Sequence, residues 1–438
     1  MRKEINFSVS NKKEFKQQLL CWSENKSVVC FLDGNIDSLE VKKKQKKYYQ
    51  YDFIVGIGVE KELKTNKKCF KSLKKFYDEN KDWLFGYISY DVKNELEKLS
   101  SLNFDGLNFN LIHFFVPQLV FSSKKDKNVK CLYKNFQKNE ILNIIDEVKK
   151  TSIKKHNTKN ITLKRRDTFE NYHKKISAIK KHIQFGDIYE LNYCMEYYNS
   201  NSQINPISVF NNLNKISSNP FSCFYKQKSN YLMCASPERF IKKNLINILS
   251  QPIKGTAKRS LILQKDKRLQ QFLLNSQKEK SENTMIVDLV RNDLSKSAKK
   301  GSVKVEEYLK LYTFKTVYQL ISTIKSSLSK HHHLIDAIKF SFPMGSMTGA
   351  PKIKAMQLIE KYENHKRGLF SGCVGYFTPE GDFDFNVVIR SILYNQKNKY
   401  VSVSAGSAIT AKSNIKSEFK ECELKAKAMF KALNANVK

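Results

Sequence analysis

One lysine of this 438-residue chain lies in a setting unlike that of most of its other lysines. Lys254 falls in the block SQPIKGT, after a proline and an apolar run, INILS, that is typical of a strand. Gly255 follows it and gives the backbone room to approach a ligand closely. Lys254 is therefore either an accident of a lysine-rich composition or a buried amine with a chemical role.

A candidate acid lies sixteen residues before this lysine. Glu238 follows a proline in the block ASPERF, between two strand-like runs, where an exposed turn glutamate is the simpler interpretation. However, ASPERF and QPIKGT lie at the two ends of one short strand-like segment, FIKKNLINILS. Both blocks could therefore lie on neighbouring strands, which would bring an acid and an amine together.

Two helix-forming blocks carry glutamates that could hold a divalent cation. Glu282 opens a predicted helix in SENTMIVDLVRNDL, although a glutamate in a first turn usually compensates the helix dipole. Glu418, Glu421 and Lys425 share one face of KSEFKECELKAKAMF, for which an ion-paired solvent face is the alternative. Two separated glutamates can hold a Mg²⁺ that also takes water and a substrate carboxylate as ligands.

Two further blocks offer groups that could bind anions. The loop MGSMTG, with Thr348, runs into a predicted helix with Pro351 in its first turn, and exposed amides at a helix start bind anions. Its spacing matches neither a P-loop nor a dinucleotide fingerprint. Arg390 lies in the apolar run NVVIRSIL, where its partner could be a ligand carboxylate held bidentately. Together the blocks suit a small dianionic substrate and an elimination or substitution.

The composition indicates a globular protein in a reducing compartment. Hydrophobic residues make up 41% of the chain, and the net charge of +36 comes mostly from lysines spread along it. No basic stripe or finger accompanies that charge, so a specific nucleic-acid partner is disfavoured. Nine scattered cysteines form no C-x-x-C pair, which favours a cytoplasmic location. The most apolar stretch, residues 111–121, is too short to cross a membrane.

The elements that must position these residues mix strands with helices. A helix is predicted over 167–186, from a capping box at Asp167 to a glycine, and a strand over 188–198. Residues 375–394 are interpreted as a hairpin that includes Arg390, and a long helix is expected over 415–433. Hairpins outnumber crossovers, so we predict an α+β fold with largely antiparallel sheets. Residues 154–160 are a plausible linker.

As a set, the motifs resemble the chorismate-utilising enzymes over about residues 166–432. Seven blocks occur in the order seen in that family: GDIYELN, SPERF, PIKGT, ENTMIVDLVRND, FPMGSMTGAPKIKAM, GYFTPEGDFDFNVVIRS and SAGSAI…SEFKECELKAKA. The resemblance implies an α/β/β/α sandwich with two orthogonally packed, largely antiparallel sheets. It also implies that 161–438 is a chorismate-binding catalytic domain and that 1–160 is an N-terminal region of the same sandwich, resembling the family's leading domain.

Lys254 distinguishes between members of the family, because the resemblance implies that some members carry lysine within PIKGT and others alanine. The lysine implies conversion of chorismate and ammonia to 4-amino-4-deoxychorismate, for folate biosynthesis. Desolvation would lower the pKa of a buried lysine, and the neutral amine can attack carbon. In the implied mechanism Lys254 adds to C2 while Glu238 protonates the departing C4 hydroxyl. Ammonia then attacks C4 and expels the lysine.

The resemblance also implies the rest of the site. Mg²⁺ would be held by Glu282 and Glu421, and the ion would bind the ring carboxylate. Glu418 would lie next to these ligands without contacting the ion. The implied substrate-binding residues are Thr256, Thr348, Tyr376, Arg390, Ala405, Gly406 and Lys425. No glutaminase module is recognisable in the chain, so ammonia is expected from solution or from a glutamine amidotransferase subunit.

The sequence differs from the family pattern at two places, and two alternative functions are open. Gln319 occupies the position of a histidine that relatives often have, and SNPFSCFY at 218–225 matches only one piece of the tryptophan pocket of relatives. The nearest alternative function is a pyruvate-eliminating lyase of the same family. An alternative from another class is a basic protein that binds polyanions through its net charge of +36.

Overall fold

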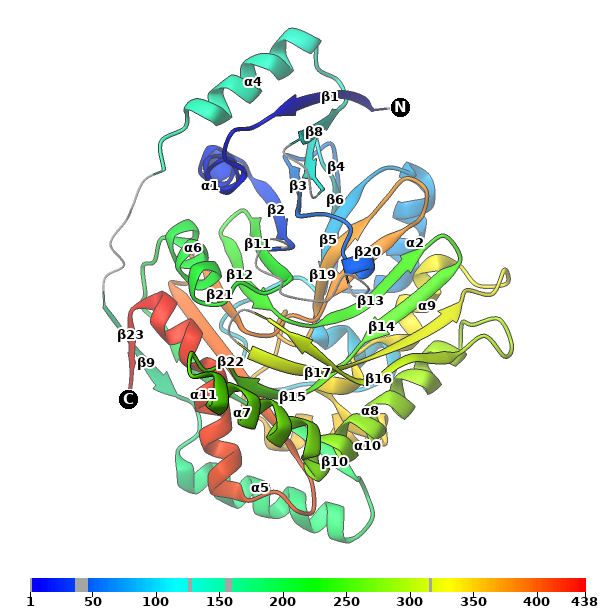
Figure 1. The fold of residues 1–438 in the computed structure, drawn as a ribbon, viewed down its shortest axis with the longest axis vertical. Helices are drawn as coiled ribbons and strands as arrows, with labels where there is room; N and C mark the ends of the chain where they lie inside the picture. Colours follow the sequence, from blue (N-terminus) through cyan, green and yellow to red (C-terminus); the bar gives the residue numbers. More distant parts are fainter. Residues whose placement is uncertain (1, 36–45, 125–127, 154–159, 315–316) are drawn as a thin grey trace.

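A computed structural model describes residues 2–35, 46–124, 128–153, 160–314 and 317–438. The predicted linker at 154–160 lies outside these ranges except for its last residue. Within them the chain forms two large, mostly antiparallel sheets with helices on their outer sides (Figure 1). The predicted α+β class is confirmed.

The first sheet has thirteen strands among the described residues. In spatial order these are β1 (Lys3–Ser8), β8 (Asn128–Tyr133), β7 (Leu119–Ser123), β3 (Phe53–Ile57), β2 (Val28–Asp33), β11 (Phe221–Gln227), β12 (Asn230–Ser236), β21 (Ser391–Asn395), β22 (Tyr400–Ile409), β10 (Glu190–Asn199), β9 (Ile161–Arg165) and β23 (Ala435–Val437), with β18 (Gly349–Ala350) also paired to β10. Only β23 and β9 pair in parallel among these described strands.

The second sheet has ten strands among the described residues. Its order is β15 (Ile253–Lys258), β17 (Val317–Ser327), β14 (Asn247–Gln251), β13 (Arg239–Asn244), β20 (Phe383–Asn386), β19 (Cys373–Phe377), β5 (Leu84–Ile88), β6 (Ile112–Val116) and β4 (Lys61–Thr65), with β16 (Lys304–Thr313) also paired to β17. The strands that carry Glu238 and Lys254 at their ends, β13 and β15, are therefore separated in this sheet by β14 and β17.

Eleven α-helices of the described chain cover the sheets. They are α1 (Lys12–Trp22), α2 (Cys69–Asn80), α3 (Lys93–Leu96), α4 (Lys138–Lys150), α5 (Phe169–Gln184), α6 (Pro206–Ile216), α7 (Leu263–Asn275), α8 (Gln277–Ser295), α9 (Leu334–Ser341), α10 (Lys352–Tyr362) and α11 (Ile415–Leu433). Short 3-10 turns are η1 (Ser23–Asn25), η3 (Lys46–Tyr48), η4 (Tyr90–Val92) and η5 (Gly345–Met347).

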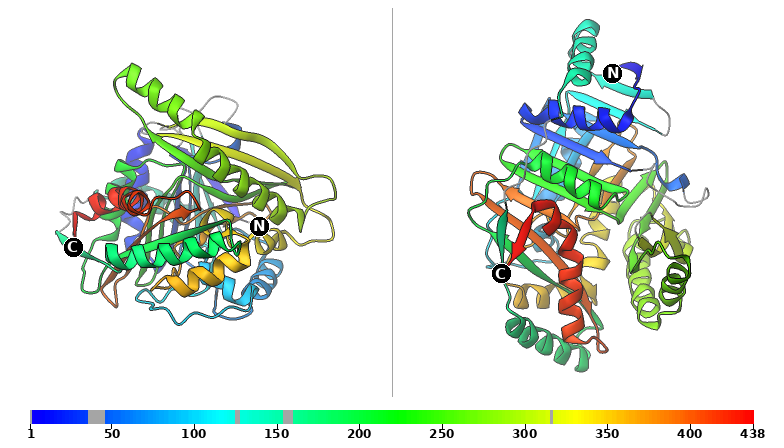
Figure 2. Two further views of the ribbon diagram at one scale, coloured as in Figure 1. Left: turned by 90° about the horizontal axis from the view of Figure 1, so that it is seen from below. Right: turned by 60° about the vertical axis from the view of Figure 1, so that its left-hand side comes forward.

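Alternation along β2 shows how the layers form. Val28 and Cys30 pack into the core shared with the second sheet, whereas Val29 and Phe31 pack into the core shared with the covering helices. A strand places successive side chains on opposite faces, so a continuously apolar strand must be covered on both sides. The helix–sheet–sheet–helix layering that the resemblance implied is thus present (Figure 2).

The N-terminal region does not form a unit of its own within this sandwich. Its strands join both sheets: β2 pairs with β11 in the first, and β5 pairs with β19 in the second. Gly86 lies opposite Gly375 in the β5–β19 pair. The segments before and after residue 160 therefore share their sheets and their cores.

Three local predictions are corrected by the structure. The N-cap of α5 is Thr168, which accepts a hydrogen bond from Asn171, while Asp167 is buried and accepts one from Lys175. Glu282 lies within α8 rather than at its start, because the helix begins at Gln277. Residues 375–394 are not one hairpin: β19 and β20 pair, and the chain then crosses to the first sheet at 387–390.

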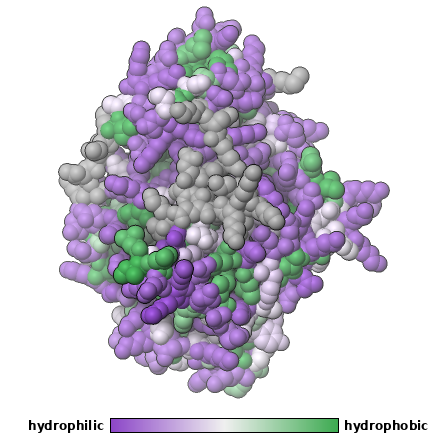
Figure 3. All heavy atoms as spheres, viewed as in Figure 1, coloured by the Kyte–Doolittle hydropathy of each residue, from purple (hydrophilic) through white to green (hydrophobic). Residues whose placement is uncertain are grey.

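The surface fits the lysine-rich composition. The face seen in Figure 3 is hydrophilic over most of its area. None of the helices among the described residues is both long and apolar enough to span a bilayer.

Candidate active site

A cavity of about 570 Å³ collects most of the residues singled out from the sequence. Its walls come from β15, β22, α8 and α11 and from the turns before β13 and α10. Of the predicted residues, those on its lining are Lys254, Glu238, Thr256, Arg390, Ala405, Gly406, Lys425, Glu282 and Glu421. The cavity therefore brings together residues as far apart along the chain as Glu238 and Lys425, which are separated by 187 positions.

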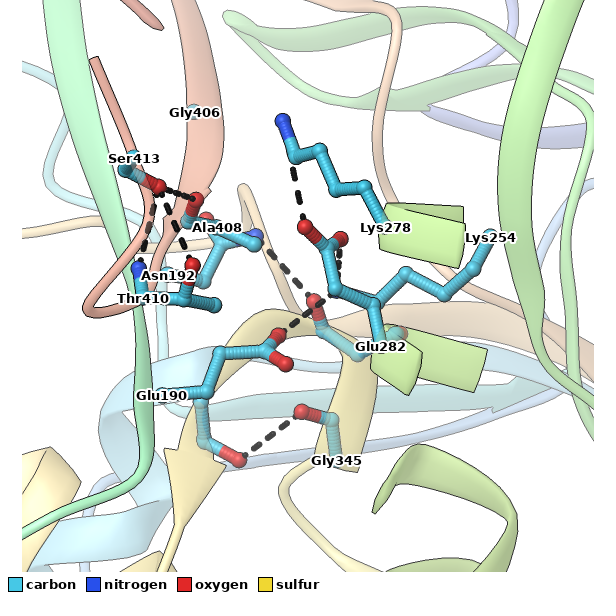
Figure 4. A network of polar contacts seen from close by, with 12 residues as sticks. Glu190, Asn192, Lys254, Lys278, Glu282, Gly345, Gly406, Ala408, Thr410 and Ser413 are labelled. Atoms are coloured by element: carbon cyan, nitrogen blue, oxygen red, sulfur yellow. Dashed lines mark hydrogen bonds and ion pairs between the residues drawn. The ribbon is translucent and has the colours of Figure 1, made fainter. Parts of the chain in front are cut away.

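Lys254 is buried and paired with a carboxylate that the sequence did not single out. Its Nζ donates to Oε1 of Glu190 at 2.6 Å and lies 3.6 Å from Oε2 of Glu282 (Figure 4). Burial alone would lower the pKa of Lys254, but the two glutamates outweigh burial and raise it. The predicted fall in pKa is therefore wrong for this arrangement, because the amine is held as an ammonium ion.

Glu238 has the character of a general acid. It lies in the turn between β12 and β13, where its side chain is 5% exposed and faces Ser346. Burial raises its pKa to about 7, although Ser346 and Lys254 act in the opposite direction. A carboxyl group with such a pKa can hold a proton near neutral pH and give it to a departing oxygen.

Four glutamates from α8 and α11 form a cluster, and three of them, Glu279, Glu282 and Glu421, line the cavity. Glu279 and Glu282 lie one turn apart on α8, and Glu418 and Glu421 do so on α11. Lys278 links the two helices: its Nζ lies 3.0 Å from Oε1 of Glu418 and 3.8 Å from Oε1 of Glu282. Burial raises the pKa of Glu282 to about 7 and also raises that of Glu279.

This cluster is chemically suited to Mg²⁺. Oε1 of Glu282 and Oε2 of Glu418 are buried without a hydrogen-bond partner, so they are free to act as ligands. Glu421 keeps a lowered pKa, because Lys425 at 2.7 Å outweighs the effect of burial. Among the described residues, however, no three acidic, histidine or cysteine side chains are close enough to hold a metal ion by themselves. Water and substrate would therefore have to complete the coordination.

Groups that could receive carboxylates also line this cavity. Arg390 lies in the crossing between the sheets, with φ of 54°, and its Nη1 donates to the carbonyl of Lys425 at 3.2 Å. Burial lowers the pKa of Arg390, yet a guanidinium stays charged at neutral pH. Nζ of Lys425 donates to the carbonyl of Gly406, on β22, at 2.9 Å.

Two of the residues predicted to bind substrate, Thr348 and Tyr376, do not lie on this cavity. Thr348 is fully buried, and its hydroxyl donates to the carbonyl of Met344. Tyr376 lines a separate cavity of about 60 Å³ together with Phe221 and Arg239. That smaller cavity includes part of the block at 218–225.

Several residues of the site escaped the sequence analysis. Glu190, on β10, belongs to the block GDIYELN but carries no distinguishing pattern, and Glu279 resembles any glutamate in a first turn. Phe370 and Ser346 also line the cavity. Gln319, at the position of the missing histidine, lines it too, with its Oε1 buried and unpartnered.

A buried ion pair between Glu363 and Arg367 supports part of the cavity wall. Arg367 donates through Nη2 to Glu363 at 2.6 Å and to the carbonyl of Asn192 at 2.8 Å. Its Nη1 donates to the carbonyl of Met347 at 2.6 Å. Because Asn192 and Met347 line the cavity, this pair fixes two parts of its wall.

Comparison with known proteins identifies the class. The family model for chorismate binding enzymes matches residues 17–431. The chain therefore belongs to the chorismate binding enzyme family, and the match spans the boundary at residue 160.

Curated relatives fall into two groups within this family. The chain is 30% identical over 392 residues to anthranilate synthase component 1 of Aquifex aeolicus, which covers 85% of this chain and 79% of that protein. It is 36% identical over 252 residues to aminodeoxychorismate synthase component 1 of Klebsiella aerogenes, covering 58% of this chain and 55% of that protein. The chain thus spans only about half the length of the second relative.

Solved structures support the fold. Anthranilate synthase component I from Streptococcus pneumoniae superposes with a TM-score of 0.76 at 23% identity, covering 86% of this chain and 91% of that one. The menaquinone-specific isochorismate synthase MenF of Escherichia coli gives a TM-score of 0.75 at 16% identity, covering 99% and 94%. The arrangement of two sheets is therefore shared by solved proteins with different names.

Proposed function

We propose that this chain acts as component 1 of an aminodeoxychorismate synthase. It would convert chorismate and ammonia to 4-amino-4-deoxychorismate, for folate biosynthesis. The observation that supports this most directly is the amine of Lys254 inside the cavity, where Glu238 lines the same wall. Burying a charged amine together with two carboxylates costs desolvation free energy, and a catalytic role would explain why this arrangement is kept.

The proposed chemistry is a double displacement. The neutral amine of Lys254 forms a bond to C2 of chorismate, the two conjugated ring double bonds shift, and the C4–O bond breaks. Glu238 gives its proton to the departing oxygen, which leaves as water. Ammonia then forms a bond to C4, the bond between C2 and the lysine breaks, and the lysine is released. The C4 ammonium returns one proton to Glu238.

The charged groups would hold the two carboxylates of the substrate. Arg390 and the backbone at Ala405 and Gly406, which line the cavity, would receive the pyruvyl carboxylate, with Lys425 beside them. Glu282 and Glu421 would bind Mg²⁺, with Glu279 and Glu418 behind them, and the ion would neutralise and hold the ring carboxylate. Thr256 and Ser346 complete the polar lining.

Ammonia would come from a glutamine amidotransferase subunit. The relatives named as component 1 suggest a two-part enzyme. Free ammonium should replace that subunit in an assay, which makes the chain testable alone.

Anthranilate synthase component 1 is the second candidate. It is favoured by the match to the Aquifex aeolicus protein, which covers more of this chain than the Klebsiella aerogenes match does. Lys254 argues against it, because a lyase that forms an aromatic product needs no amine at this position.

The decisive experiment is product identification after incubation with chorismate, Mg²⁺ and ammonium. Formation of 4-amino-4-deoxychorismate would support the proposal, and formation of anthranilate with pyruvate would overturn it in favour of the second candidate. Lys254→Ala should abolish amination, and retention of most of the wild-type rate would exclude the covalent role. Salt-dependent binding of nucleic acid without turnover would instead favour a polyanion-binding protein.

A further inference from the structure

The proposed reaction requires a proton acceptor for Lys254, and neither Lys254 nor Glu238 can fill that role. Nζ of Lys254 lies 2.6 Å from Oε1 of Glu190, as an ammonium does in an ion pair, and an ammonium has no electron pair with which to attack carbon. Glu238 cannot accept this proton, since it must itself carry one for the leaving oxygen. Another group has to take the proton from Nζ before the C–N bond can form.

We propose that Glu190 is the catalytic base that takes the proton from Lys254 and later returns it. This inference rests on the proposed function. The geometry points to Glu190 because its Oε1 lies 2.6 Å from Nζ, which is direct hydrogen-bond contact with the reacting atom. Glu282, the other carboxylate near this amine, is at 3.6 Å and belongs to the cluster suited to a metal ion.

Glu190 is positioned by the backbone rather than by its partner. It begins β10 and lies opposite Ala350 of β18, while the next residue, Leu191, pairs with both β18 and β22. Gly349 permits this close approach, because a Cβ at that position would lie 2.1 Å from the carbonyl oxygen of Glu190. The carboxylate is thus held in place on a paired strand, as a catalytic group should be.

The surroundings of Glu190 leave it free to accept a proton. Its side chain is 1% exposed, and Oε2 is buried with no hydrogen-bond partner. Buried carboxylates normally have both oxygens satisfied, so an unsatisfied oxygen calls for an explanation. A carboxylate that becomes a neutral acid during each turnover needs fewer partners than one that stays charged.

Substrate binding would favour the proton transfer. Chorismate filling the cavity would remove water from the pair, and desolvation disfavours both the ammonium and the carboxylate. Transfer along the 2.6 Å contact converts two charges into two neutral groups without changing the net charge of the site. Glu190 lies behind Lys254 and not on the cavity wall, so the carboxylate does not face the dianionic substrate directly.

The proton balance closes over one turnover. Glu190 takes one proton from the lysine ammonium, and the freed electron pair forms the bond to C2. When ammonia displaces the lysine, the amine leaves with its electron pair and takes that proton back from Glu190. Glu238 loses a proton to water and regains one from the new C4 ammonium, so the net change is chorismate plus ammonia to product plus water.

Other charged groups face this pair and must be considered in any pH dependence. They come from α8, α11 and the turn before β13, and they are Glu282, Glu279, Lys278, Glu421, Lys425 and Glu238. A direct pH profile would mix their ionisations with that of ammonia. The ratio of wild-type to variant rates at each pH cancels those contributions that the two proteins share.

The test is Glu190→Gln, which keeps size and a hydrogen-bond acceptor but cannot take a proton. With saturating chorismate, Mg²⁺ and ammonium, kcat should fall at least a hundredfold at pH 7. The ratio of wild-type to variant kcat should then shrink about tenfold per pH unit as the lysine loses its proton to solvent. A ratio near one, or a large ratio that is constant between pH 6 and pH 8, would overturn the role of Glu190, since an ion pair that only holds the lysine in place gives no such slope.

Two further variants separate the explanations. Glu190→Asp keeps a carboxylate and should retain the wild-type pH profile at a reduced rate, so it tests the proposal even if Glu190→Gln fails to fold; a steeper profile would contradict the base. Glu360→Gln is a matched control, because Glu360 pairs with buried Lys93 at 2.9 Å outside the cavity. Its rate and pH profile should be unchanged, and a change would show that the assay reports general destabilisation.

Lys254→Ala separates this inference from the proposed function. If this variant keeps its activity, the covalent mechanism itself fails and Glu190 has no proton to accept. If it is inactive while Glu190→Gln resembles the wild type at every pH, only the assignment of Glu190 fails.

Discussion

Lys278 and Glu418 join the two helices that carry the acidic cluster, with Nζ and Oε1 3.0 Å apart. The ammonium thus takes up a position among carboxylates where a cation is needed. The side chain of Lys278 is 45% exposed, so it can leave this position at little cost when another cation enters.

Lys278→Met should therefore strengthen the binding of Mg²⁺. Removing the ammonium takes the Lys278 ion pair from Glu418 and leaves Glu282 with Lys254 as its neighbouring cation, so a divalent ion should bind several-fold more tightly. The shift in melting temperature on titration with Mg²⁺ measures this without substrate. Lys280→Met, on the same helix, serves as the control, and equal titration curves for both variants would argue against a metal between α8 and α11.

Glu282→Gln and Glu421→Gln should have the opposite effect. Each variant replaces an anionic oxygen that Mg²⁺ prefers with a weaker neutral ligand, so the half-saturating Mg²⁺ concentration should rise about tenfold or more. The rate of chorismate consumption at increasing Mg²⁺ provides the measurement. Titration curves that coincide with that of the wild type for both variants would exclude these helices as the metal site.

The pKa of Glu238, raised to about 7, predicts a specific pH dependence of activity and stability. The acid is active only while protonated, so kcat/KM should fall as pH rises above about 7. The folded pKa also exceeds the usual value of 4.5, so the associated stability is complete below pH 4.5 and is lost as pH rises through 7. Urea unfolding of Glu238→Gln should show this pH dependence reduced by up to about 3 kcal/mol. Identical slopes in variant and wild type would mean that Glu238 titrates normally.

Arg390 should matter more to substrate capture than the overall charge of the protein. Salt near 0.15 M screens surface charges beyond about 8 Å, whereas Arg390 acts at contact distance in a buried site. Raising salt from low to physiological concentration should reduce kcat/KM less than about tenfold, which is below about 1.4 kcal/mol. Arg390→Lys should cost more, because an ammonium cannot reproduce the bidentate geometry. A steep salt dependence together with an unaffected variant would reverse this ranking.

The pair of Glu363 and Arg367 should contribute mainly to stability. Both side chains are 1% exposed, so Arg367→Met leaves a buried carboxylate without its partner and should destabilise the fold by about 3–5 kcal/mol. The free energy of unfolding in urea measures this. Arg165→Met breaks a half-exposed pair with Glu423 and should change stability by less than about 1 kcal/mol. Similar losses for both variants would show that burial of the pair is not decisive.

Site residues could be predicted from the sequence where their immediate sequence neighbours are unusual, and not where only a long-range contact reveals them. Lys254 and Glu238 stood out because proline, glycine and apolar residues surround them, and the structure places both on one cavity. Glu190 could not be recognised, because its meaning comes from the contact between β10 and β15, sixty-four positions apart. That same contact reversed the predicted pKa of Lys254, since desolvation was considered without the carboxylate that accompanies it.

The fold was predictable in class but not in its connections. Alternating apolar residues indicate strands, yet they do not show that the chain leaves one sheet for the other at 387–390. Arg390 was therefore expected in a strand and lies in the crossing instead. Tyr376 carried the same family motif but points to the smaller cavity, because β19 belongs to the second sheet.

The sharing of both sheets by the two ends of the chain affects how the protein can be made. β5 can gain its partner β19 only after nearly 290 further residues have been synthesised, and β2 waits similarly for β11. Contacts of such long range form slowly, so one edge of β2 and one edge of β5 must remain unpaired until these partners have been synthesised, although β2 can pair with β3 and β5 with β6. A fragment that starts at residue 161 would expose the edges of β11 and β19 where β2 and β5 belong. Such a fragment would tend to aggregate, although it contains the cavity-lining residues.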